Sequence, residues 1–358
     1  VTKPRVPVRD VVRALPAYVP GARPGSGTAE KLSSNENPFP PLAGVERAVA
    51  AAARQMNRYP DMFATELVEA IARRHGVEPA SVVTGAGSVA VLGHVLQAFC
   101  DAGDEVVHAW RSFEAYPIAV RLQGAVPVPV DLDADGRHDL AAMRAAVGPR
   151  TRAVLVCSPN NPTGPAVRRP ELDDFLAAVP DDVLVVLDEA YVEFVRDAQA
   201  VDGLSLLAAH PNVVVLRTFS KAYGLAGLRV GYAIAHPDLA LAVRSASTPF
   251  GVSHPAQVAA LASLEAEPAL VERVDAVVAE RDRMVDALRQ RGWHLPDTQA
   301  NFVWLPVGDQ TVALAADAAA HGLLVRPFAG EGIRITVGDP AANDRVLALA
   351  AEWELVES

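Results

Sequence analysis

Short apolar blocks and longer mixed blocks follow one another along the first two thirds of the chain. The short blocks are rich in valine and leucine and predict buried strands, whereas apolar residues every three or four positions predict helices. The expected strands are residues 81–84, 105–109, 126–130, 153–157, 183–187 and 213–216. The expected helices are residues 46–56, 65–75, 89–99, 116–123, 140–146, 170–178 and 204–209. This alternation predicts an α/β fold, in which helices cover both faces of a mostly parallel sheet.

The pattern changes near residue 255. Residues 256–291 predict long helices with charges on one face. Strands are expected at 301–305, 323–326 and 333–337, with helices at 312–321 and 340–353. The first 34 residues are rich in proline and glycine, which predicts an arm with apolar anchors only at 15–20. We therefore expect three parts: an N-terminal arm (1–34) that contributes to the small domain and the substrate pocket, a large domain (35–250) and a smaller α+β domain (251–358).

Composition excludes several classes of function. The 358 residues are 51% hydrophobic, enough for one large core and a smaller one, and the net charge is -11 with no basic stripe for nucleic acid. No apolar run reaches the roughly 18 residues of a membrane helix, and the first residues lack the apolar segment of a signal peptide. Cys100 and Cys157 lie in apolar surroundings, which favours buried thiols in a reducing cytoplasm. The nine histidines have no metal-ligand spacing, so no metal is expected.

One lysine has the setting of a reactive amine. Lys221 lies in the stretch RTFSKAYGLAGLRVGY (217–232), among small and apolar residues and just after an expected strand. Apolar surroundings disfavour the ammonium form and lower the pKa. A neutral amine can form a Schiff base with an aldehyde. Taken alone, the same stretch is also compatible with a lysine on a surface loop.

Two further motifs favour the reactive amine over the lysine on a surface loop. SPNNPTG lies at 158–164 and LDEAYVEF at 187–194. The order and spacing of the three motifs resemble the fold-type I pyridoxal-phosphate (PLP) aminotransferases, in particular the histidinol-phosphate aminotransferase branch. The resemblance extends from about residue 15 to residue 337. Within the branch, LPAYVPG (15–21), WRSF (110–113) and the block from 217 look most like the actinobacterial aromatic amino acid aminotransferases.

The resemblance implies a catalytic set of Lys221, Asp188 and Tyr191. Lys221 would hold the cofactor as a Schiff base and then move a proton as general base. Asp188 follows an apolar strand and would keep the pyridine nitrogen protonated. Tyr191 and Asn161 would donate to the phenolic oxygen of the ring. Without the resemblance, Asp188 could cap a turn, and residues 159–164 also have the composition of a tight turn.

A phosphate site is expected between a strand and a helix. The sequence GAGSV (85–89) places backbone N–H groups at a helix N-terminus, which favours an anion. The resemblance also implies that a tyrosine of the partner subunit reaches the phosphate, which makes the enzyme a homodimer with shared sites; Tyr59 matches it. The resemblance assigns the cofactor phosphate to Gly87, Ser88, Val89, Thr218, Ser220 and Arg229.

The resemblance assigns the ring and substrate contacts as well. Phe113 takes the position that stacks on the cofactor, while Trp110 and Tyr116 are interpreted as ordinary core aromatics. Arg334 alternates inside an apolar strand and needs an anion, which in the family is the substrate carboxylate. Arg326 is either a second substrate contact or part of a salt bridge at the rim. The expected substrate-binding residues are Tyr18, Asn161, Asn301, Arg326 and Arg334.

Three other functions are partly compatible with the sequence. Gly85-x-Gly87-x-x-Ala90 fits a dinucleotide fingerprint, but Asp104 and Glu105 begin the next strand instead of ending it. A PLP-binding regulator usually carries an added DNA-binding domain, for which the arm is too short. A decarboxylase or lyase of the same fold is disfavoured by Arg334.

The sequence therefore predicts a cytoplasmic, homodimeric, PLP-dependent aminotransferase with a ping-pong mechanism. Its substrates would be an aromatic amino acid and a 2-oxo acid such as 2-oxoglutarate. The alternative is histidinol phosphate, whose phosphate dianion calls for a second cation near Arg334. Between Arg326 and Arg334 there is no further cation and one acid, Glu331. Phe328, Tyr18 and Phe113 could instead surround an aromatic ring.

Overall fold

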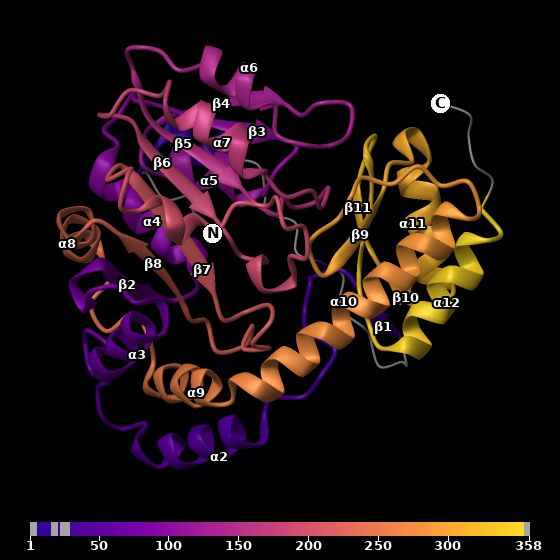
Figure 1. Ribbon diagram of the computed structural model, residues 1–358, viewed down its shortest axis with the longest axis horizontal. Helices are drawn as coiled ribbons and strands as arrows, with labels where there is room; N and C mark the ends of the chain where they lie inside the picture. The colour runs from indigo at the N-terminus through magenta and orange to yellow at the C-terminus, as the bar shows by residue number, and fades with distance from the viewer. Residues whose placement is uncertain (1–5, 16–20, 22–28, 354–358) are drawn as a thin grey trace.

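A seven-stranded sheet forms the larger part of the molecule in the computed structural model, which describes residues 6–15, 21 and 29–353 (Figure 1). Its strand order is β2-β8-β7-β6-β5-β3-β4. The strands are β2 (Val82–Gly85), β3 (Glu105–Trp110), β4 (Val126–Asp131), β5 (Thr151–Cys157), β6 (Leu184–Asp188), β7 (Val213–Thr218) and β8 (Gly231–Ala235). The strand β8 pairs antiparallel with both of its neighbours, β2 and β7, and the other strand pairs of this sheet are parallel. The predicted mostly parallel sheet is confirmed.

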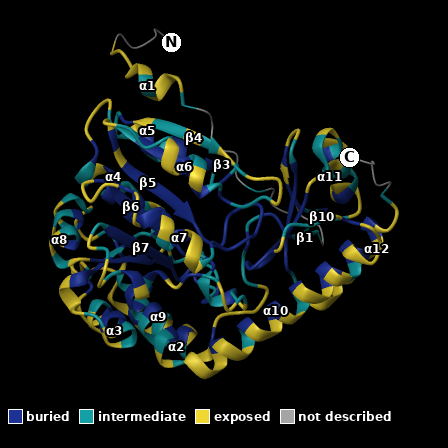
Figure 2. Cartoon of the chain, turned by 45° about the horizontal axis from the view of Figure 1, so that its top comes forward, coloured by how far each residue is buried: buried dark blue, intermediate teal, exposed yellow. Residues whose placement is uncertain are grey.

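Helices pack on both faces of this sheet. Alternate residues of β5 enter opposite cores. Leu155 faces a cluster with α4 (Ser88–Phe99) and α5 (Ala115–Leu122), and Val156 faces a cluster with α6 (Leu140–Ala145) and α7 (Arg169–Leu176). Figure 2 shows the central strands buried and the outer helix surfaces exposed. The helices of this part are α2 (Ala43–Ala52), α3 (Thr65–His75), α4 (Ser88–Phe99), α5 (Ala115–Leu122), α6 (Leu140–Ala145), α7 (Arg169–Leu176) and α8 (Pro237–Ala246). Short 3-10 helices are η1 (Ala53–Gln55), η2 (Pro79–Ser81), η3 (Val192–Phe194) and η4 (Gly203–Leu206), the last of which replaces the helix expected at 204–209.

The apolar pattern did not predict β8 because three glycines precede or begin it. Gly231 pairs with Gly85 of β2 on one side and with Thr218 of β7 on the other. A Cβ atom at Gly231 would collide with the backbone at Ser88. Glycine is therefore needed where the backbone at the start of α4 passes close to β8.

A smaller sheet lies beside the large one (Figure 1). Its order is β11-β12-β9, with strands β9 (Phe302–Leu305), β11 (Arg326–Phe328) and β12 (Gly332–Thr336). The strand expected at 323–326 divides: β10 (Leu323–Leu324) pairs with β1 (Glu30–Lys31), and β11 pairs with β12. The helices of this part are α10 (Glu267–Arg289), α11 (Thr311–Ala320) and α12 (Pro340–Ala350), with η5 (Gly308–Gln310). Two further helices contact those of the large sheet: α9 (His254–Glu265) contacts α2 and α3, and α1 (Asp10–Arg13) contacts α5.

The long helix α10 leads from α9, below the large sheet, to the small sheet (Figure 1). It buries apolar residues such as Val274 and Val277 in a core shared by both parts. No helix in the part of the chain that the structure describes is long and apolar enough to cross a membrane.

Candidate active site

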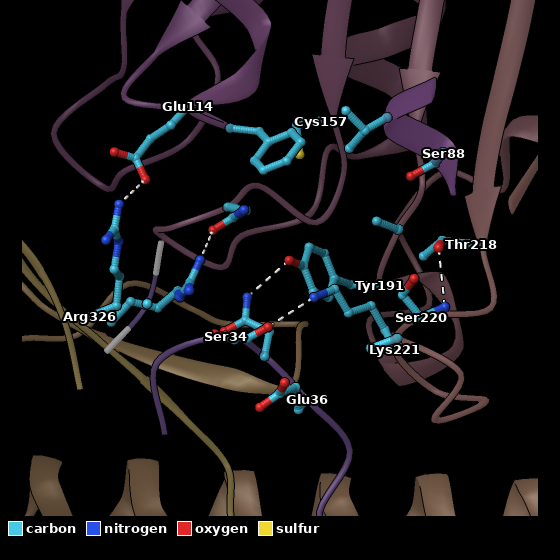
Figure 3. Close-up of a pocket in the computed structure, with 18 of the residues that line it drawn as sticks. Ser34, Glu36, Ser88, Glu114, Cys157, Tyr191, Thr218, Ser220, Lys221 and Arg326 are labelled. Atoms are coloured by element: carbon cyan, nitrogen blue, oxygen red, sulfur yellow. Dashed lines mark hydrogen bonds and ion pairs between the residues drawn. The ribbon is translucent and has the colours of Figure 1, made fainter. Parts of the chain in front are cut away.

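A pocket of about 290 Å³ lies between the large and the small sheet. Its walls come from the carboxyl ends of the parallel strands, where α/β sheets place ligands, and from the small sheet opposite them. Figure 3 shows Thr218, Ser220 and Lys221 at one end and Glu114 with Arg326 at the other. Most of the predicted site residues line it: Ser88, Val89, Phe113, Asn161, Asp188, Tyr191, Thr218, Ser220, Lys221, Arg229, Arg326 and Arg334.

Lys221 is half-buried just after β7 and points into this pocket. Its Nζ donates to the backbone oxygen of Ser34 at 3.1 Å. Burial lowers the pKa of Lys221 to about 7, and the positive charge of Arg334 adds to this effect. Near neutral pH the amine is therefore present in both protonation states, as the apolar sequence around it predicted.

Asp188 ends β6 and is buried. Its Oδ2 accepts a 2.8 Å hydrogen bond from the hydroxyl of Tyr116, while its Oδ1 has no hydrogen-bond partner among the described residues. Burial raises the pKa of Asp188 to about 6, although the Tyr116 bond opposes that rise. The prediction of Tyr116 as an ordinary core aromatic missed this contact, because nothing in the sequence indicates that the two residues meet.

An anion cradle forms where α4 begins. Gly87 caps this helix with φ 85°, and a Cβ atom there would collide with the guanidinium of Arg229. Arg229 donates to Ser220 Oγ at 3.3 Å, and the Ser220 N–H donates to Thr218 Oγ1 at 3.1 Å. Arg229 itself has φ 58°, a conformation that costs energy for a residue with a side chain. Helix N–H groups, hydroxyls and a guanidinium together suit a phosphate.

The two asparagines of the SPNNPTG motif have different surroundings. Asn161 lines the pocket, and its Oδ1 accepts from Arg334 Nη1 at 2.6 Å. Asn160 is buried in the turn, where its Oδ1 accepts from Ser112 Oγ at 2.8 Å. Its carbonyl accepts from the Gly164 N–H at 2.8 Å, so the motif is both a tight turn and a source of a pocket side chain.

Residues 33–36 line the pocket but were not predicted. Asn35 Nδ2 donates to the Tyr191 hydroxyl at 2.9 Å, and the Ser33 carbonyl accepts from Arg334 Nη2 at 2.7 Å. Asn35 also has φ 53°. In sequence the run SSNEN resembles an exposed loop, and its burial becomes visible only when the small sheet packs on it.

Two ion pairs of opposite polarity join the segment after β3 to the small sheet. Arg326 Nη2 lies 2.6 Å from Glu114 Oε2, and Arg111 pairs with Glu331. The rim salt bridge that was one interpretation of Arg326 is therefore present, although Arg326 also lines the pocket.

Three predicted residues do not line the pocket, and a fourth is not described. Tyr59 is 84% exposed and packs on Phe250, with ring centroids 4.8 Å apart, outside the pocket. Asn301 differs from the expectation of a lining residue: it is buried at the start of β9, where its Nδ2 donates to the Asn35 carbonyl at 3.2 Å. Gly87 lies against the guanidinium of Arg229 and does not line the pocket itself. Tyr18 falls outside the described residues.

The dinucleotide alternative has no support in this geometry. Glu105 begins β3 and pairs with Arg150, and neither it nor Asp104 lines the pocket. Within the described residues, no three histidine, cysteine, aspartate or glutamate side chains gather as a metal site.

Fold and pocket together define an enzyme of the aminotransferase type, and the chain belongs to the family described as Aminotransferase class I and II, which matches residues 28–349. This confirms the resemblance on which the site prediction rested.

Two relatives and one solved structure are similar to this chain over most of its length. The chain is 54% identical over 354 residues to an aromatic amino acid aminotransferase of Streptomyces coelicolor, which covers 98% of each chain. It is 53% identical over 348 residues to an aromatic amino acid aminotransferase of Thermobifida fusca, which covers 97% of each. Among solved structures, a histidinol-phosphate aminotransferase of Sinorhizobium meliloti, in complex with pyridoxal-5'-phosphate, matches with a TM-score of 0.84 and 31% identity over 90% of this chain and 89% of that one.

Proposed function

We propose that this enzyme is a PLP-dependent aminotransferase that moves the amino group of an aromatic amino acid to a 2-oxo acid such as 2-oxoglutarate. The observation that carries the proposal is that Lys221, whose pKa is lowered to about 7, and the buried Asp188 line the same pocket. The names of the Streptomyces and Thermobifida relatives support the aromatic substrate.

The residues present fit the cofactor. The Oδ1 of Asp188 is buried and has no partner among the described residues, as expected of an acceptor for a ring N–H. The cradle of Ser88, Ser220 and Arg229 suits the phosphate. When bound, PLP supplies a ring that withdraws electrons from the substrate Cα and so weakens its C–H bond.

Each catalytic side chain then has a defined task. Lys221 would form the covalent attachment to the cofactor and, once released, would take the proton from the substrate Cα and deliver it to the cofactor, which its pKa near neutrality favours. Asp188 would keep the ring nitrogen protonated through Oδ1, while Tyr116 holds Oδ2. Tyr191 would donate toward the phenolic oxygen, because its hydroxyl accepts from Asn35 and burial raises its pKa.

Substrate binding follows from the other end of the pocket. Arg334 is the proposed clamp for the α-carboxylate, and Asn161, whose Oδ1 accepts from Arg334, keeps its NH₂ group as a donor. Phe113 and Phe328 line the pocket as surfaces for an aromatic ring. Tyr18 completes the proposed substrate set, and Asn301 supports it through Asn35.

A homodimer with shared sites is part of the proposal. The exposed Tyr59 and Phe250 form an aromatic pair on the surface of this chain, which would suit a contact with a second copy. Tyr59 would then reach the phosphate of the partner's site. We also propose the division into arm, large domain and small domain given above, and a reducing cytoplasm, which agrees with two free buried cysteines.

Substrate competition tests the proposal. We expect kcat/KM with 2-oxoglutarate as acceptor to be higher for phenylalanine or tyrosine than for histidinol phosphate. If histidinol phosphate is preferred by more than about tenfold, roughly 1.4 kcal/mol, the aromatic assignment is replaced by the alternative. Glutamate should form in step with loss of the amino acid, whereas release of carbon dioxide would indicate a decarboxylase.

A further inference from the structure

Two arginines lie side by side on one wall of the pocket. Arg326 of β11 and Arg334 of β12 are direct cross-strand partners, and both line the pocket. Their guanidinium carbons lie 5.4 and 5.9 Å from the centre of the same Phe328 ring. No further cation lies between these two positions in the sequence, but the folded strands make Arg326 itself the second cation beside Arg334. Two adjacent guanidiniums are a general solution for binding a dianion.

Glu114 changes the chemistry of that pair. Its Oε2 lies 2.6 Å from Arg326 Nη2, and the side chain of Arg326 is only 8% exposed. Glu114 itself lines the pocket and is 30% exposed. A charge-assisted hydrogen bond at this depth is strong, because water screens it weakly. Arg334, in contrast, donates to the neutral oxygens of Asn161 and Ser33.

We propose that Glu114 is a specificity-determining residue that selects uncharged aromatic side chains over side chains bearing a phosphate dianion. The inference rests on the proposed function, because it concerns the substrate of that same site. A dianion that approached Arg326 would be repelled by the Glu114 carboxylate. Displacing Glu114 would leave a partly buried carboxylate without its cation, which is costly. Specificity built on such a repulsive group excludes the wrong ligand without any new contact to the right one.

The second ion pair supplies a matched control. Arg111 pairs with Glu331, which is 35% exposed and lies in the turn between β11 and β12, but neither of them lines the pocket. Glu331→Gln and Glu114→Gln each remove one negative charge from the region that joins the two sheets. Only Glu114→Gln removes the carboxylate that pairs with a guanidinium lining the pocket, so an effect of net charge alone would be common to both variants.

The test combines binding and turnover on the PLP-loaded enzyme at about pH 8, where a phosphate monoester is a dianion. Calorimetry measures the Kd of phenyl phosphate, a dianion, and of 3-phenylpropionate, a monoanion with a similar ring. Kinetics give kcat/KM for histidinol phosphate and for phenylalanine. In Glu114→Gln we expect phenyl phosphate to bind about tenfold more tightly and the histidinol phosphate to phenylalanine ratio to rise about tenfold, with 3-phenylpropionate changed less than about threefold.

The proposal is overturned if Glu114→Gln leaves both the phenyl phosphate Kd and the kcat/KM ratio unchanged, or if Glu331→Gln reproduces its effects. Should Glu114→Gln not fold, Glu114→Asp keeps the charge and withdraws it from Arg326, and a smaller change in the same direction is expected; no change there refutes the inference equally. Failure of the proposed function can be distinguished from failure of this inference. If the enzyme does not transaminate phenylalanine, the Kd values of the two calorimetric ligands still measure the effect of Glu114.

Discussion

Removing one hydroxyl group, that of Tyr116, tests how Asp188 is prepared for its role. In Tyr116→Phe the ring can keep its contact with Phe113, whose centroid is 5.6 Å away, but the 2.8 Å hydrogen bond to Asp188 is lost. Burial holds the pKa of Asp188 at about 6, and the Tyr116 bond opposes that rise. The pKa of Asp188 should therefore rise further in the variant.

The magnitude follows from the lost bond. A hydrogen bond to a charged group contributes about 1.5–3 kcal/mol, and about 1.4 kcal/mol corresponds to one pH unit. The pKa of Asp188 should therefore rise by about one to two pH units. At about pH 7.5 the ionised fraction would fall from nearly all of the protein to between about one quarter and three quarters.

The assay is the pH dependence of PLP binding to the cofactor-free protein. An ionised Asp188 favours the protonated ring nitrogen, so affinity should fall on the acid side at a higher pH in Tyr116→Phe than in the wild type. Titration of the cofactor phosphate is common to both proteins and cancels in the difference. Tyr232→Phe is the matched control, because the buried Tyr232 hydroxyl bonds to His75 Nε2 at 3.0 Å, outside the pocket. If PLP affinity falls at the same acidic pH in the wild type and in Tyr116→Phe, the Tyr116 hydrogen bond does not set the pKa of Asp188.

Three further predictions concern the same site. Lys221→Ala should still bind PLP without a covalent bond but lose several powers of ten in turnover, measured by absorption and steady-state kinetics; near-normal turnover would remove its assigned role. In the cofactor-free protein the pKa of Lys221, about 7, lies below the ordinary 10.5, so the unfolded state binds more protons between those values. Stability to urea should rise with pH across that window, and Lys221→Met should abolish the rise; an unchanged slope would contradict the lowered pKa. Heterodimers of Lys221→Ala and Tyr59→Phe chains should regain activity through one intact site, and no recovery in verified heterodimers would exclude a shared site.

Local sequence pattern predicted the strands and the residues that follow them. Asp188, Asn161 and Lys221 were placed correctly because the carboxyl ends of neighbouring parallel strands meet at one edge of the sheet. Nearly every helix and strand boundary lies within a few residues of its expected position, since apolar period reflects burial directly.

The local sequence pattern does not predict contacts between segments that are far apart in the chain. Tyr116 and Asp188 are 72 positions apart, and Glu114 and Arg326 are 212 apart. Neither pair has a periodicity or a local motif, because each depends on how two finished elements pack. The antiparallel strand β8 was missed for a different reason: its backbone must pass close to Ser88, so glycine replaces the apolar residue that would have marked a strand.

The segment at residues 33–35 links binding to the cooperativity of unfolding. Its backbone oxygens accept hydrogen bonds from Lys221, which follows β7 of the large sheet, and from Arg334, which lies in β12 of the small sheet. The Asn35 N–H also donates to Thr336 Oγ1 of β12 at 2.8 Å. Separating the two sheets would therefore break the pocket before either sheet lost its own strands. A ligand that binds only the assembled pocket shifts the equilibrium away from every partly opened form. Saturating cofactor should accordingly narrow thermal unfolding to a single transition in which both sheets melt together.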